Sequence, residues 1–163
     1  MTSTTATTRR QLVTCEAAGE LFAMDIASVE RVLRYSPPSS VPNSAGWLRG
    51  VISHGTRLVP VIDLRERLGL PSKDVDTRAR IVVVTLEDGP LGVIVDAVHE
   101  VAAIDAASVE APPAVYRGLS KDYVHGIVKR GEKLFVLLDI ARLVSSKERI
   151  EMRKAVEKGG KNG

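Results

Sequence analysis

The chain of 163 residues is poor in features that would place it outside the cytoplasm. It has a single cysteine, Cys15, which excludes a disulfide within the chain and is typical of a reducing compartment. No apolar run approaches the roughly 20 residues that a membrane-spanning helix needs. The first ten residues, MTSTTATTRR, lack the apolar core of a secretory signal. We therefore expect a cytoplasmic protein that does not insert into a membrane.

Aromatic residues make up only 4% of the chain, which argues against a nucleic-acid-binding surface. Proteins that bind single strands stack bases on aromatic side chains interleaved with basic ones, and no segment here has that pattern. The formal net charge of +3 comes from the ends of the chain, since residues 146–163 hold six Lys and Arg against three Glu. A nucleic-acid-binding small β-barrel stays open as an alternative, which strongly salt-dependent binding to DNA or RNA would favour.

The sequence also lacks a recognisable catalytic or metal-binding group of residues. The three histidines, His54, His99 and His125, are far apart, and none has a second His or Cys at metal-ligand spacing. There is no glycine-rich phosphate loop, and we expect Cys15 to be a core residue on a strand. We therefore expect no metal, no cofactor and no enzymatic activity, with an undetected enzyme as the alternative.

What the chain does contain is an internal repeat. GVISHGTRLVPVIDLRERL, beginning at Gly50, aligns without a gap to GIVKRGEKLFVLLDIARLV, beginning at Gly126. The matched pairs include Gly50 with Gly126, Gly55 with Gly131, Arg57 with Lys133, and Asp63 with Asp139. Chance rarely matches glycine, base and aspartate in one register, so the sequence predicts a duplication whose two copies superpose.

Each copy is predicted to begin with a hairpin, at 11–26 and at 80–98, because Gly-bearing turns there separate short apolar runs. A second hairpin and a short helix follow, with Gly55 at positive φ in one turn. Many short strands in two equal halves favour a mainly β fold of two small barrels packed together.

The helices are expected to begin at capping residues. Asp63 and Asp139 are predicted to cap the short helices, and Ser145 with Glu148 forms a capping box before a final helix.

The boundaries follow from the repeat. We expect a disordered lead at 1–10, one barrel at about 11–75, a second at about 76–145, and a basic C-terminal helix or tail at 146–163. The tail has few apolar residues and no partners in the pattern for its charges. We therefore expect it to be dispensable for folding.

The segment GWLRGVISHGTRLVPVIDLRERLGL resembles the signature of CheW-like coupling proteins. ERVLRYSPPSSVPNSAGWLRG, GVIVDAVHEV and YVHGIVKRGEKLFVLLDIARLV resemble other parts of the same family, so the resemblance covers about residues 12–145. It implies two five-stranded SH3-like barrel subdomains. It also implies a non-catalytic adaptor that couples the cytoplasmic tip of chemoreceptors to the regulatory domain of a CheA-type histidine kinase, in an array with other CheW-like proteins.

The resemblance assigns candidate binding residues. Those that stand where the family holds the receptor's helical tip are Val29, Ile94, Val95 and Val98. Those in the hairpin near the kinase-binding face are Gly50, His54, Thr56 and Arg57. For the first set the alternative is ordinary barrel core, above all for Ile94.

Two positions depart from the family's pattern. Arg31 stands where an acidic residue is common, and Gly55 where an arginine is usual. Both positions are tied to receptor and kinase contacts in the family, so we expect kinase binding to be weakened. This leaves open a receptor-binding paralogue without kinase binding, in gliding motility or another specialised pathway. Glu30 and Arg57 lie beside these positions and could restore a charged pair, although strand alternation would point Glu30 away from Arg31.

Overall fold

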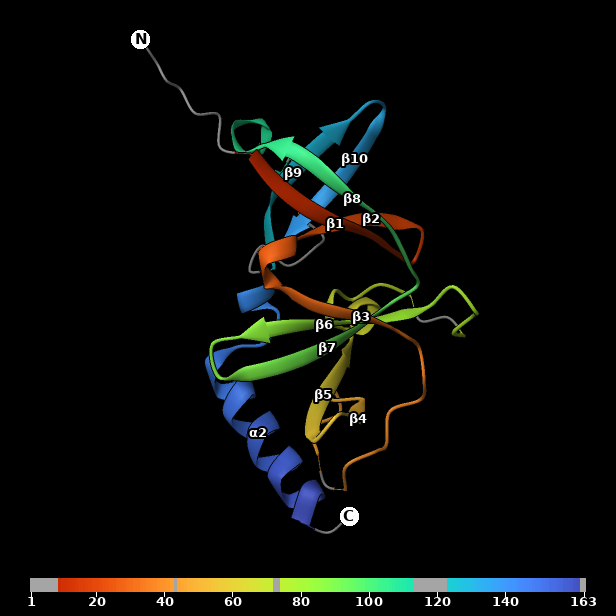
Figure 1. Cartoon of the computed structure of the whole chain (residues 1–163), viewed down its shortest axis with the longest axis vertical. Helices are drawn as coiled ribbons and strands as arrows, with labels where there is room; N and C mark the ends of the chain where they lie inside the picture. Colours follow the sequence, from red (N-terminus) through yellow and green to blue (C-terminus); the bar gives the residue numbers. More distant parts are fainter. Residues whose placement is uncertain (1–8, 43, 72–73, 113–122, 162–163) are drawn as a thin grey trace.

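The computed structural model describes residues 9–42, 44–71, 74–112 and 123–161. The strands within these ranges form two five-stranded sheets, which are the two SH3-like barrels predicted from the sequence. The barrels are stacked, and a long helix runs along the side of the lower one (Figure 1). The predicted fold class is confirmed. None of the helices in these ranges is long and apolar enough to cross a membrane.

The strands divide equally between the two repeats. The first repeat contains β1 (Arg9–Ala17), β2 (Glu20–Asp25), β3 (Val29–Arg34), β4 (Gly50–His54) and β5 (Arg57–Asp63). The second contains β6 (Arg80–Leu86), β7 (Gly89–Val95), β8 (Ala97–Asp105), β9 (Val124–Arg130) and β10 (Lys133–Leu138). The helices are α1 (Leu64–Arg67), α2 (Ser146–Lys161) and the 3-10 turns η1 (Ile26–Ser28), η2 (Ala106–Ser108) and η4 (Ile140–Arg142).

The two repeats exchange their first hairpins. One sheet has the order β3-β6-β7-β5-β4, and the other has the order β8-β1-β2-β10-β9. Parallel pairing of β5 with β7, and of β10 with β2, joins each exchanged hairpin to its new sheet. We call the barrel of β3–β7 the central barrel, and the barrel of β1, β2 and β8–β10 the terminal barrel (bottom and top in Figure 1).

This exchange differs from the predicted barrels at about 11–75 and 76–145, because each barrel takes strands from both halves of the chain. The two hairpins have similar apolar patterns, so each fits either sheet locally. Only the pairing of distant strands decides which sheet a hairpin joins. The predicted lead is also shorter than expected, since Arg9 and Arg10 belong to β1 and Arg10 pairs with Asp25 at 2.8 Å. Residues 1–8 of that lead lie outside the described ranges.

Three clusters of buried side chains form the core. The largest lies between the barrels and takes residues from both sheets, among them Cys15, Phe22 and Val82. The other two belong to the central and the terminal barrel, one each. Cys15 is fully buried, as predicted, and burial raises the pKa of its thiol to about 12. The thiol is therefore protonated at neutral pH and is a poor nucleophile.

Gly50 and Gly126 have equivalent surroundings in the two repeats. A Cβ atom on Gly50 would collide with the backbone oxygen of Ser39, and one on Gly126 would lie 2.8 Å from the backbone oxygen of Glu110. In each repeat the residue after the glycine pairs with that neighbouring segment through an isolated β-bridge. Close backbone approach is therefore the reason for glycine at both positions.

The aspartates that precede the short helical segments, Asp63 at the end of β5 and Asp139 just after β10, differ between the repeats. Asp63 caps α1 as predicted, accepting a hydrogen bond from the amide of Arg65 at 2.9 Å. Asp139 makes no such capping bond, so the prediction for this residue is wrong. Its carboxylate instead lies 3.4 Å from the guanidinium of Arg142. The ion pair draws the carboxylate away from the first turn of η4.

Helix α2 begins at the predicted capping box. The amide of Ser145 donates to Glu148 Oε1 at 2.9 Å, and the amide of Glu148 donates to Ser145 Oγ at 3.2 Å. The packing of this tail argues against its being dispensable, because Met152 is 1% exposed and belongs to the core between the barrels. Met152 therefore fixes one face of this mostly polar helix to the core, and Ala155 packs beside it.

Acidification is expected to weaken the docking of α2. Burial raises the pKa of Glu148, but the hydrogen bond and charge of Arg67, with the amide of Ser145, outweigh it and hold that pKa below its usual 4.5. A carboxyl group with a depressed folded-state pKa stabilises the fold above its unfolded pKa and loses this effect as the pH falls. The difference in unfolding free energy between wild type and Glu148→Gln should therefore shrink below about pH 4.5. Urea unfolding at pH 7 and pH 3 measures it, and an equal difference at both would contradict the prediction.

Candidate binding surfaces

The edge strand β3 of the central barrel contains a β-bulge. Val29 lies opposite Val84 and Arg31 lies opposite Val83, so Glu30 has no partner residue on β6. The regular alternation that predicted a position for Glu30 is interrupted at this point. The carboxylate of Glu30 lies 3.1 Å from Nη1 of Arg57 at the start of β5, so the pair considered from the sequence does form.

The turn between β4 and β5 requires a glycine at position 55, where the resemblance noted in the sequence implies an arginine. His54 pairs with Arg57, which leaves a two-residue turn of Gly55 and Thr56. Gly55 has φ +64°, as predicted, and Thr56 has no positive φ, which is the pattern of a type II′ turn. A side chain at position 55 would be strained by about 1–2 kcal/mol, whereas Arg57 carries its charge on ordinary strand backbone.

The other predicted hairpin residues have different environments. Thr56 and Arg57 are exposed and His54 is half-buried, so all three are accessible. Gly50 is buried at the far end of β4 and is a packing position. The hairpin therefore offers a surface at its tip and not along its whole length.

The four predicted groove residues, three valines and one isoleucine, do not form one surface. Ile94 is 3% exposed within the central barrel, and Val95 is 1% exposed in the core between the barrels. Both lie on β7, which is paired on each side and covered on each face, so neither has surface to offer. Val29 and Val98 are half-buried at the start of edge strands β3 and β8, where they pack against the core between the barrels.

Sequence reasoning missed several exposed residues beside these valines. Val32 on β3 and Val101 on β8 are exposed apolar side chains. The period-two pattern of each strand is broken by its bulge, and for this reason the sequence alone could not indicate which side chains face outward. The missed residues extend the accessible apolar surface from Val29 along β3 and from Val98 along β8.

The terminal barrel carries a counterpart of the Glu30 pair. Glu100 lies in the bulge of β8 and its carboxylate is 3.3 Å from Nη1 of Arg130, at the end of β9. Thr14 holds this bulge, since its Oγ lies 2.9 Å from the carbonyl oxygen and 3.1 Å from the amide of Glu100. In each barrel, an acid on one edge strand is thus paired with a base of the hairpin at the other end of the sheet.

A surface cavity of about 720 Å³ lies beside this second pair. Its apolar lining residues are Leu21, Val98 and Phe135, and its charged ones include Glu16, Glu100 and Lys133. No group of three or more His, Cys, Asp or Glu among the described residues could hold a metal ion. The cavity is therefore a hollow with a mixed apolar and charged lining.

Stacked SH3-like barrels with apolar and charged positions on their edge strands define a binding module. The CheW-like domain profile matches residues 11–148 of the chain. The chain therefore belongs to the CheW-like domain family.

Individual relatives agree with this assignment. The chain is 30% identical over 142 residues to the chemotaxis protein CheW of Treponema pallidum, covering 85% of this chain and 84% of that protein. It is 29% identical over 144 residues to CheW of Bacillus subtilis, covering 86% and 90%. The crystal structure of the scaffolding protein TtCheW from Thermoanaerobacter tengcongensis matches with a TM-score of 0.79 and 32% identity, covering 86% of this chain and 97% of that one.

Proposed function

We propose that this protein is a non-catalytic cytoplasmic adaptor that couples the cytoplasmic tip of a chemoreceptor to the regulatory domain of a CheA-type histidine kinase. The observation that carries the proposal is the CheW-like fold with accessible binding positions on both barrels. Val29 and Val98 provide half-buried apolar contacts, and beside the hairpin Arg57 neutralises the carboxylate of Glu30.

The receptor is expected to bind at the half-buried valines. An amphipathic helix binds by placing apolar side chains on an apolar surface, and Val29 and Val98 are the members of the predicted groove that are not enclosed in the core. Val98 also lines the cavity on the terminal barrel, where a helix side chain can insert. The kinase regulatory domain is expected to bind at the tip of the β4–β5 hairpin.

Replacing Val98 with glutamate is expected to weaken receptor binding by about 30-fold or more, because it places an unpaired charge in a contact that loses its water on binding. Titration calorimetry with the receptor's cytoplasmic tip measures the effect. Ile150→Glu is the matched control, because Ile150 is 58% exposed on α2, and it should bind as wild type does. Wild-type affinity in the Val98→Glu variant would remove Val98 from the receptor site.

A pull-down with the receptor tip and the kinase regulatory domain, each tested separately, examines the proposed function directly. Binding to both supports an adaptor. Binding to the receptor alone would favour the paralogue without kinase binding, and binding to neither would refute the proposal.

A further inference from the structure

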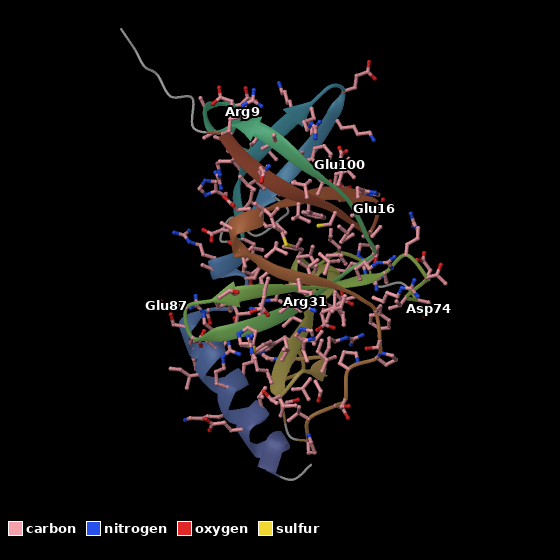
Figure 2. All side chains as sticks on the ribbon, in the orientation of Figure 1. Arg9, Glu16, Arg31, Asp74, Glu87 and Glu100 are labelled. Atoms are coloured by element: carbon pink, nitrogen blue, oxygen red, sulfur yellow. The ribbon has the colours of Figure 1, made fainter. Side chains whose placement is uncertain are left out.

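The outer edge of β3 carries positive charges without partners. Arg31 and Arg34 are exposed, and among the described residues neither forms an ion pair. Arg34 lies directly opposite Arg80 on β6, an arrangement that places like charges side by side. Figure 2 shows Arg31 on β3 of the lower, central barrel. This strand edge therefore has positive charge that nothing within the described chain neutralises.

The surrounding protein does not share this charge. Residues 11–145 contain 15 Lys and Arg against 17 Asp and Glu, so the body of the protein is slightly acidic. A local excess of arginine on such a body is a specific feature of the β3 edge. It also has a cost, because unpaired like charges repel one another in the free protein.

The same edge is accessible for docking in other respects. β3 is the last strand of its sheet, so one side of its backbone has no neighbouring strand. Val32 lies between Arg31 and Arg34 and is an exposed apolar residue. Side chains alternate along this part of β3, so Val32 and Arg34 lie on the face of their partners Val82 and Arg80, and Arg31 lies on the opposite face. A segment running along this edge would therefore meet a guanidinium group on each face, which matches a segment with carboxylates on either side of a small apolar residue.

The Glu30–Arg57 pair decides how much of this charge is available. Glu30 is adjacent to Arg31 and would repel an approaching carboxylate if it were free. Arg57 holds its carboxylate at 3.1 Å, which neutralises that repulsion. Because the bulge gives Glu30 this position, the acid beside Arg31 is paired, and Arg31 itself is left without an ion pair among the described residues.

We propose that the β3 edge, formed by Arg31, Val32 and Arg34, docks an acidic segment of the kinase regulatory domain. The proposal rests on the proposed function and specifies the chemistry of its kinase-binding face. The charge reversal at position 31 is then an adaptation to a partner of opposite charge. Arg57 acts as a positioning residue, since it masks Glu30 and does not contact the partner's carboxylates.

The test is titration calorimetry with the purified regulatory domain of the cognate kinase at two salt concentrations. Arg31→Glu should weaken binding more than about tenfold, because a carboxylate then faces a carboxylate. Arg57→Gln should weaken it severalfold by unmasking Glu30, whereas Glu30→Gln should leave it unchanged or tighter. A structural role for the ion pair would instead make these last two variants equally weak.

Lys154→Glu is the matched control, because it makes the same change of charge at an exposed position on α2. It should bind the kinase domain nearly as wild type does, with the same dependence on salt. Equal losses for Arg31→Glu and Lys154→Glu would overturn the proposal, since the effect would then be one of overall charge.

Three further results separate this proposal from the proposed function. Wild-type binding to the kinase domain that Arg31→Glu leaves intact overturns the docking surface and leaves the adaptor function standing. Binding to the receptor tip alone overturns the docking surface and leaves a receptor-only protein. Binding to neither partner, or binding of a DNA or RNA oligonucleotide that Arg31→Glu abolishes, overturns both.

Discussion

Deleting residues 147–163 is expected to lower the free energy of unfolding by about 3–5 kcal/mol, although these residues look like a solvated tail in the sequence. Met152 is the main reason, because its side chain is 1% exposed and fills part of the core between the barrels. Its removal uncovers apolar neighbours and leaves space that the surrounding barrel strands cannot close. Removing a buried methionine side chain alone costs about 2–5 kcal/mol.

The deletion also removes the one carboxylate from the contacts that centre on Arg67. The guanidinium of Arg67 lies 5.3 Å from the ring centre of Trp47 and 5.7 Å from that of Tyr123. Its Nε donates to the carbonyl of Leu143 at 2.8 Å, and its Nη2 pairs with Glu148. Without Glu148, this half-buried cation loses its only carboxylate among the described residues, which adds to the cost of losing Met152.

A second contact fastens α2 nearer its C-terminal end. Arg153 Nη1 donates to the carbonyl of Pro90 at 2.8 Å, and the guanidinium lies 3.4 Å from Asp88 in the β6–β7 turn. A Cβ atom on Gly89 would lie 3.1 Å from the centre of that guanidinium. The glycine therefore makes room for the arginine, and the helix is held on both sides of Met152.

Urea unfolding of the full chain and of the truncated chain measures the predicted loss. Met152→Ala should account for a large share of it, whereas Ile150→Ala should change the unfolding free energy by less than about 0.5 kcal/mol because Ile150 is exposed. If truncation changes the free energy by less than about 1 kcal/mol, α2 does not dock in solution and the original interpretation of a dispensable tail is right.

The features that the sequence predicts well are those set by a few neighbouring residues. The capping box of Ser145 and Glu148 is local, and so is the positive φ of Gly55 in its turn. Local patterns are sufficient here because each involves hydrogen bonds or steric limits within four residues.

The features that the sequence does not predict depend on distant contacts. The hairpin exchange is set by parallel pairing between strands of different repeats, such as β5 with β7. The burial of Met152 depends on where α2 lies against the barrels, and the burial of Ile94 and Val95 depends on β7 being an interior strand. The Glu30–Arg57 pair depends on a β-bulge in β3, and no residue of β3 predicts that bulge from the sequence.

Arg65 connects the two barrels and thereby sets how their binding surfaces are arranged. Its side chain is 3% exposed, with Nη2 3.6 Å from Asp63 and Nε 3.4 Å from Asp96, the residue that joins β7 to β8. Asp96 Oδ2 accepts a hydrogen bond at 2.7 Å from the amide of Ala18, in the turn between β1 and β2. These contacts lead from α1, beside the central barrel, through Asp96 between β7 and β8, to the β1–β2 turn of the terminal barrel.

Replacing Arg65 with alanine is therefore expected to lower the free energy of unfolding by about 3 kcal/mol. This is the lower end of the range for breaking a buried ion pair, because Nε and Nη1 have no hydrogen-bond partner among the described residues and already bear a desolvation cost. Arg65→Met should lose less, since its apolar side chain fills much of the same space. Arg49→Ala is the control, because its pair with Glu66 is exposed and should contribute under about 1 kcal/mol.

The same substitution distinguishes a link between the barrels from a contact within one of them. If Arg65 holds the barrels in register, Arg65→Met should weaken binding of the receptor tip and of the kinase domain together, although Arg65 lies on neither proposed surface. Calorimetry with each partner on the folded variant measures this, and circular dichroism confirms that the variant is folded at the assay temperature. Unchanged affinity for both partners, with a loss of stability, would show that Arg65 stabilises the central barrel alone and that the two surfaces act independently.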